Sequence, residues 1–255
     1  MKKLFLLTYI VCNSLILKIH AQQTLIAKYN FTHIRDTTQP LNPYNEEMIL
    51  FTNNNTAIYK SYPMYLLDSL LNSNTSISNI KVPKGTTEQI FTSFTSKEII
   101  LIRPWLQDTF GIKYPLQDII WQLIDSTKKI GNFICNKAIG EYGGRKYACW
   151  YCPQIAVRSG PWKLNGLPGL IISAVDEKNQ VSFALNAIRQ ANYQEITIPK
   201  DITYITEKKF SEMKEAFKAN PNAVLGNTLG NDNVNFQKKG NGNSNYRLNN
   251  PLELN

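Results

Sequence analysis

The chain has 255 residues, a hydrophobic fraction of 43% and a formal charge of +9 at pH 7. A chain of this length and composition can bury a full hydrophobic core, and it needs neither disulfides nor a metal to fold. Its positive charge is scattered in short pairs, whereas a nucleic-acid-binding protein is expected to gather charge in one stripe. The pairs are Lys128-Lys129, Lys208-Lys209 and Lys238-Lys239.

The first 21 residues have the composition of a secretory signal peptide. A charged start at Lys2 and Lys3 precedes an apolar stretch from Leu4 to Leu17, and a passable cleavage site ends at Ala21. We therefore predict an exported protein, cleaved near Ala21, that resides in the periplasm or the outer cell envelope. No later stretch approaches the ~20 apolar residues of a membrane-spanning helix, so no transmembrane segment is expected in the mature chain.

After the leader, short aromatic and β-branched runs alternate with clusters of Asn, Gly, Ser and Pro, which is typical of a β-rich domain. The sequence predicts a mainly β fold of the α+β kind: a single curved antiparallel meander or half-open barrel with one or two covering helices. The expected strands are Leu25–Ile34, Met48–Thr52, Ala57–Lys60, Glu88–Phe94, Glu98–Ile102, Asp118–Ile124, Phe133–Ile139, Arg145–Tyr151, Leu170–Val175, Val181–Ile188 and Glu195–Ile198.

Two helices are expected. Tyr62–Leu71 follows Ser61, a favourable N-cap residue, and has Pro63 in its first turn, where a missing N–H costs little. Glu207–Ala219 carries Phe and Met side chains at helical spacing with Glu and Lys between them, which is typical of a packing face.

The composition changes once along the chain, near Asn220. Residues 220–255 are rich in Asn and Gly and poor in hydrophobic side chains, so they bury too little surface to offset the entropy of ordering. The sequence thus predicts a signal peptide at 1–21, a β-rich domain at 22–219, and a flexible C-terminal tail at 220–255 with short anchored pieces.

The run SGPWKLNGLPGLIISAVD, from Ser159 to Asp176, contains the most distinctive motif. Pro168 and Gly169 suit the second and third positions of a type II turn, and the apolar LIISAV that follows suits a strand covered on both faces. One interpretation is a corner that leads into a buried central strand, with Trp162 capping the core. The other is a rigid rim around an apolar pocket. The first is preferred because the run contains no nucleophile and no phosphate-binding glycine pattern.

Three segments carry a family resemblance: YNFTHIRDTTQP, KKIGNFICNKAIGEYGGRKYACWYCPQI and GPWKLNGLPGLII. The chain resembles the GLPGLI family, exported proteins of Bacteroidetes named after the letters found here at Gly166, Leu167, Pro168, Gly169, Leu170 and Ile171. The resemblance implies a cell-envelope location and brings no biochemical activity with it. Cys149 and Cys152 depart from the family pattern, which has a small residue and a polar residue at these places.

Three cysteines follow the leader: Cys135, Cys149 and Cys152. A hairpin with Gly140–Gly144 as its loop sets Cys135 opposite Cys149, at a separation of ~4.5–5.5 Å that a disulfide accepts. The alternative is three buried thiols. Cys149 and Cys152 have the spacing of a redox motif, but in a strand their side chains point to opposite faces, which argues against that chemistry.

His33 is the one histidine beyond the leader, and the acidic residues are dispersed. We therefore expect no catalytic residue, no cofactor and no metal site. The first hypothesis is a non-enzymatic envelope protein that binds a lipid or other amphiphile on a concave sheet, with Trp121, Trp150 and Trp162 converging on the cavity. The second is a module that docks onto an outer-membrane protein. The third is an undetected hydrolase, in which His33 would meet Ser, Asp or Glu in a cleft.

Overall fold

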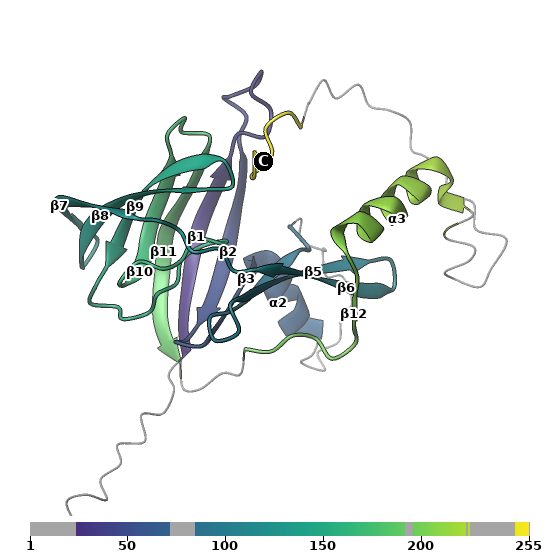
Figure 1. Ribbon diagram of the computed structural model, residues 1–255, viewed down its shortest axis with the longest axis horizontal. Helices are drawn as coiled ribbons and strands as arrows, with labels where there is room; N and C mark the ends of the chain where they lie inside the picture. Colours follow the sequence, from purple (N-terminus) through teal and green to yellow (C-terminus); the bar gives the residue numbers. More distant parts are fainter. Residues whose placement is uncertain (1–23, 72–84, 192–195, 223, 225–247, 255) are drawn as a thin grey trace, which may run out of the picture.

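The computed structural model describes residues 24–71, 85–191, 196–222, 224 and 248–254, so the predicted signal peptide lies outside the described residues. Within these ranges the chain forms twelve strands and two helices (Figure 1). In chain order the elements are β1 Thr24–His33, β2 Tyr44–Thr52, β3 Thr56–Ser61, α2 Tyr62–Leu71, β4 Gln89–Ser93, β5 Glu98–Trp105, β6 Asp108–Pro115, β7 Gln122–Ile130, β8 Phe133–Tyr142, β9 Arg145–Cys152, β10 Leu170–Asp176, β11 Val181–Ala191, β12 Ile202–Tyr204 and α3 Glu207–Ala219.

All twelve strands belong to one open sheet in the order β12-β6-β5-β4-β3-β2-β1-β11-β10-β9-β8-β7. Two meanders, β1 to β6 and β7 to β11, are joined where β1 pairs with β11. Every pairing is antiparallel except the short parallel contact of β12 with β6. The consecutive strands β6 and β7 lie towards opposite edges, so the sheet does not close into a barrel. The predicted mainly β, antiparallel fold is confirmed.

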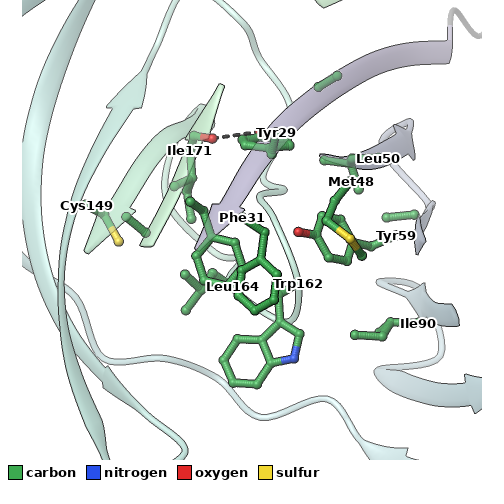
Figure 2. Packing of buried hydrophobic residues seen from close by; sticks show 14 of the residues in the cluster. Tyr29, Phe31, Met48, Leu50, Tyr59, Ile90, Cys149, Trp162, Leu164 and Ile171 are labelled. Carbon is green, nitrogen blue, oxygen red and sulfur yellow. Dashed lines mark hydrogen bonds between the residues drawn. The ribbon is translucent and has the colours of Figure 1, made fainter. Parts of the chain in front are cut away.

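The main hydrophobic core lies on the face of the sheet that carries Tyr29, Phe31, Met48 and Tyr59, which we call the inner face. The connection between β9 and β10 folds back over this face and adds Trp162 and other apolar side chains to the core. Figure 2 shows Trp162 within this cluster of core side chains, with Phe31 and Leu164 drawn nearby. The sheet therefore packs around a loop of its own chain.

Both predicted helices are confirmed. Ser61 caps α2, because its hydroxyl accepts a hydrogen bond from the backbone N–H of Met64 at 3.3 Å. The hydroxyl of Thr206 caps α3 in the same way, accepting from Lys209 N–H at 3.1 Å. α2 covers the outer face through aromatic side chains, and α3 packs on the sheet through Phe210.

Two predicted strands are wrong. The strand expected at Asp118–Ile124 begins instead at Gln122, and residues 196–198 are not in a strand. β6 and β12 were not predicted. β6 was missed because its hairpin with β5 turns at Leu106, which adopts a φ of 54° without the Gly or Asn that usually marks such a turn.

Candidate functional site

A cavity of about 250 Å³ lies on the inner face, between strands β1 to β4 and the β9–β10 loop. Its wall is apolar and aromatic. Phe31 stacks on Phe183 with a ring separation of 5.1 Å, and Phe183 in turn stacks on Trp162 at 6.3 Å. Met48 and Ile90 complete the apolar wall.

The β9–β10 loop holds Trp162 in a fixed place, because the part of the loop that carries Trp162 is buried. Residues 159–165 are buried in an unbroken run, and Trp162 itself adopts a φ of 56°. Backbone hydrogen bonds fix the loop at both ends: Ile171 N–H donates to Ser159 at 3.1 Å, and Leu164 N–H donates to Pro161 at 3.1 Å. A non-glycine residue in the left-handed region is uncommon and is held there by its surroundings.

The Pro-Gly corner closes this loop against β9. Gly169 donates its N–H to the carbonyl of Leu167 at 2.8 Å, which is a γ-turn centred on Pro168, tighter than the expected type II turn. Pro168 is exposed, whereas Leu167, Leu170 and Ile171 are fully buried. The motif thus forms the corner, and its neighbour Trp162 forms part of a cavity wall.

Two buried polar atoms at this cavity have no hydrogen-bond partner, Nε2 of His33 and the hydroxyl of Tyr59. Each side chain is only 4% exposed. Buried polar groups in native proteins are almost always paired, so an unpaired atom in a cavity wall marks a place where a polar ligand atom or a water molecule fits. Burial raises the pKa of Tyr59 well above its usual value, so its hydroxyl keeps its proton.

His33 is neutral at physiological pH. Its pKa is lowered to about 4, first by burial and then by the positive charges of Arg35 and Arg145, against a backbone hydrogen bond with Asn250 and the charge of Asp176. Its ring lies 6.0 Å from that of Phe31, two residues earlier on β1, so the two side chains share a face of the sheet. No hydrogen bond joins Nε2 to a serine, cysteine or acid among the described residues, so the base–nucleophile pair of a hydrolase is not formed there.

Charged side chains gather at the mouth of the cavity. The guanidinium carbon of Arg35 lies 3.4 Å from the centre of the Tyr44 ring. Glu46, behind Tyr44, accepts hydrogen bonds from the Tyr44 hydroxyl at 2.5 Å and from the Thr86 hydroxyl at 2.6 Å. Glu88 is paired with Arg103. Over the described ranges, Arg35 forms no ion pair.

Residues 248–254, which we call the C-terminal strap, lie across one side of the cavity, and Leu252 forms part of its wall. Arg145 holds the strap: Nε donates to the carbonyl of Leu252 at 3.0 Å, and Nη2 donates to Oδ1 of Asn250 at 2.6 Å. Figure 1 shows the strap, in yellow, near the ends of β1 and β2. This anchored piece of the predicted tail has a defined place against the sheet.

The three predicted tryptophans do not converge on the cavity. Trp162 forms part of its wall, but Trp121 and Trp150 do not. Trp121 packs beside the loop, where its Nε1–H donates to the carbonyl of Asn165 at 2.8 Å. Trp150 carries Lys128 and Lys137 over its ring, each at 5.9 Å. Its side chain points opposite to that of the neighbouring buried Cys149, as the alternation of a strand requires.

The predicted disulfide between Cys135 and Cys149 is not formed, and the three cysteines in the described residues are free and buried. The hairpin turns at Gly143 and Gly144, with φ values of 57° and 71°, so Tyr142 faces Arg145 and Cys149 faces Ala138. A two-residue turn of this kind is common because its twist matches that of the strands. The prediction failed because it assumed a longer loop and so the wrong register.

We expect all three thiols to be labelled by a maleimide after unfolding without reductant, and to react slowly before it. Burial raises the pKa of Cys135 to about 11 and also raises that of Cys149, so little thiolate is present in the folded state. Intact-mass spectrometry of residues 22–255 counts the labels, with a reduced sample as control. A single label on the unreduced, unfolded chain would mean that two of the cysteines are bridged.

No helix within the described ranges is both long and apolar enough to cross a bilayer. In the same part of the chain, no group of three or more His, Cys, Asp or Glu side chains is arranged to hold a metal ion. The candidate site is an apolar cavity with a charged mouth, in an open β-sheet that packs around its own loop.

No family model and no curated protein matches the chain. Solved structures with a similar fold include two crystal forms of PNGF-II, in space groups P21 and C2, each with a TM-score of 0.54 and 14% sequence identity. Each match covers 75% of this chain and 33% or 32% of the PNGF-II chain, so this chain spans about a third of that protein. At this identity the similarity shows a shared fold alone.

Proposed function

We propose that this protein is an exported, non-enzymatic component of the cell envelope that binds a small amphiphile in the inner-face cavity. The observation that carries the proposal is the cavity itself, with an aromatic and aliphatic wall at Phe31, Trp162 and Phe183 and charged groups at its mouth. The location is supported by the signal-like composition of the first 21 residues and by the resemblance to the GLPGLI family.

The size of the cavity limits the ligand. Pockets for drug-sized ligands measure ~300–1,000 Å³, and this cavity measures about 250 Å³. It therefore suits one short chain or one end of a longer molecule. Its largely apolar wall favours hydrocarbon, because transfer of apolar surface out of water supplies roughly 25 cal/mol per Å².

The test begins with native mass spectrometry of residues 22–255 purified from the periplasm, combined with organic extraction and analysis of lipids. We expect a bound amphiphile that the extraction removes. Decanol, a neutral ten-carbon amphiphile, is then titrated into the extracted protein by calorimetry. If another protein co-purifies and no amphiphile does, the result favours the docking module.

A cavity-filling variant locates the binding site. Met48→Phe adds volume to the cavity wall, so we expect it to weaken decanol binding at least about tenfold, or ~1.4 kcal/mol, with little loss of stability because the added atoms enter existing space. Met213→Phe on α3 is the matched control, since Met213 is not among the residues that line this cavity. If the wild-type protein neither co-purifies with an amphiphile nor binds added decanol, the proposal is contradicted.

A further inference from the structure

The mouth of the cavity has a chemical preference that the apolar wall does not explain. We infer that the ligand is a carboxylic acid with an unbranched apolar chain, whose carboxylate is bound by Arg35 next to His33 while the chain runs along the inner face. This inference rests on the proposed function and adds to it the chemistry of the polar end.

Arg35 is the first support. Its guanidinium is held flat against Tyr44, and stacking on an aromatic ring leaves the edge N–H groups free to donate. The acids nearby are already engaged, Glu46 by Tyr44 and Thr86 and Glu88 by Arg103. A cation fixed at the mouth of an apolar cavity, with no ion-pair partner in the described part of the chain, is complementary to an anionic group.

The surrounding charges favour a single negative charge. The carboxylate of Glu46 accepts a hydrogen bond from the N–H of Thr86, and Glu88 lies two residues after Thr86. Both carboxylates therefore lie near the mouth. A carboxylate carries one charge, which Arg35 balances. A phosphate monoester carries nearly two at neutral pH, and Arg35, the cationic side chain among the residues that line the cavity, balances only one of them.

His33 is the second support. Its Nε2 is buried at the cavity without a partner. The charged groups that act on the ring are Arg35, on the same segment, Arg145 from β9 and Asp176 at the end of β10, together with the backbone of Asn250 from the strap. The two arginines disfavour the protonated ring, and a bound carboxylate offsets them. Binding of the carboxylate and protonation of His33 should therefore favour each other.

The shape of the cavity is the third support. Tyr59 pairs with Leu50, which pairs with Ala27, six residues before His33 on β1. At ~3.3 Å per residue the two cavity-lining positions are roughly 20 Å apart along the strand direction. A cavity that reaches from one to the other within about 250 Å³ is narrow. An unbranched chain fits such a space, with its polar end at His33 and its hydrocarbon along the apolar wall of Phe31 and Met48.

The experiment compares three ten-carbon probes, decanoate, decanol and decyl phosphate, by calorimetry at pH 7. We expect decanoate to bind at least about tenfold more tightly than decanol. Arg35→Gln should remove this advantage, because it should weaken the binding of decanoate far more than the binding of decanol. Arg189→Gln, which removes the same charge from an exposed position on β11, should change neither.

The pKa of His33 gives an independent measurement, because His33 is the sole histidine of residues 22–255 and its NMR signals are therefore unambiguous. Its ring signals in NMR spectra should titrate with a pKa of about 4 in the free protein. Saturating decanoate should raise that pKa by about one unit or more, and decanol should not.

Equal affinity for decanoate and decanol, or an unchanged decanoate affinity in Arg35→Gln, would overturn carboxylate recognition and leave amphiphile binding in place. Tighter binding of decyl phosphate than of decanoate would overturn it in favour of a phosphate group. Failure of all three probes to bind would count against the proposed function as well.

Discussion

Arg145→Met is expected to lower the free energy of unfolding by about 3–5 kcal/mol, because it leaves a buried carboxylate without its cation. Arg145 Nη1 donates to Oδ2 of Asp176 at 2.8 Å, and the two side chains are 1% and 3% exposed. The same guanidinium holds the C-terminal strap through the carbonyls of Leu252 and Pro251. Urea denaturation followed by circular dichroism measures the loss.

The chain contains a matched control for this prediction. Lys146 and Glu177, the next residues after Arg145 and Asp176, form an exposed ion pair at 3.9 Å. Lys146→Met should change stability by less than about 0.5 kcal/mol, because exposed pairs are screened by water. Equal effects of the two substitutions would show that burial of the Arg145 pair does not determine its importance.

Gly169→Ala is expected to cost about 3 kcal/mol or more. Gly169 has a φ of 147°, which L-residues rarely adopt, and a Cβ there would lie 2.2 Å from the carbonyl oxygen of Cys152. Since the obstacle is backbone, no side chain can move aside, and the corner itself must shift. Thermal and urea denaturation report the change, and loss of soluble expression would be the extreme form of the same result.

Gly131 separates the two causes of the expected loss, which are the positive φ and the close approach of the new Cβ to the backbone of Cys152. It also has a positive φ, 57°, but nothing lies within 4 Å of the position of its Cβ. Gly131→Ala should therefore cost only the ~1–2 kcal/mol of backbone strain. If Gly169→Ala were no worse than Gly131→Ala, the close approach to Cys152 would be unimportant.

The sequence predicted most of the fold where local chemistry decides the structure. Ser61 before Pro63 placed the start of α2 correctly, and alternating apolar residues located the strands of the inner core. Predictions failed at two hairpin turns, and only the first of them lacks the usual turn residues. Leu106 turns the β5–β6 hairpin without glycine, and Gly143-Gly144 makes a tighter turn than the five-residue loop that was expected.

The candidate site was less predictable because its parts come from segments far apart in the chain. Trp162 was noticed because it lies in a motif rich in Pro and Gly, and His33 because it is the one histidine of residues 22–255. Arg35 and Leu252 gave no local signal. Arg35 follows β1 directly, and Leu252 reaches the cavity because the strap returns to β1, where Asn250 N–H donates to the carbonyl of Arg35 at 3.1 Å. Trp121 and Trp150 were nominated by residue type alone, which does not specify a face of the sheet.

The central place of β1 in the sheet bears on how the chain reaches this structure. β1 is synthesised before every other strand of the sheet, yet one of its two neighbours is β11, whose residues Val181–Ala191 follow some 150 positions later. Contacts of such long sequence separation slow folding, since a large loop must close before they form. The two parts of the sheet can therefore join only when β11 is available to pair with β1, and we expect their union to be a late step of folding.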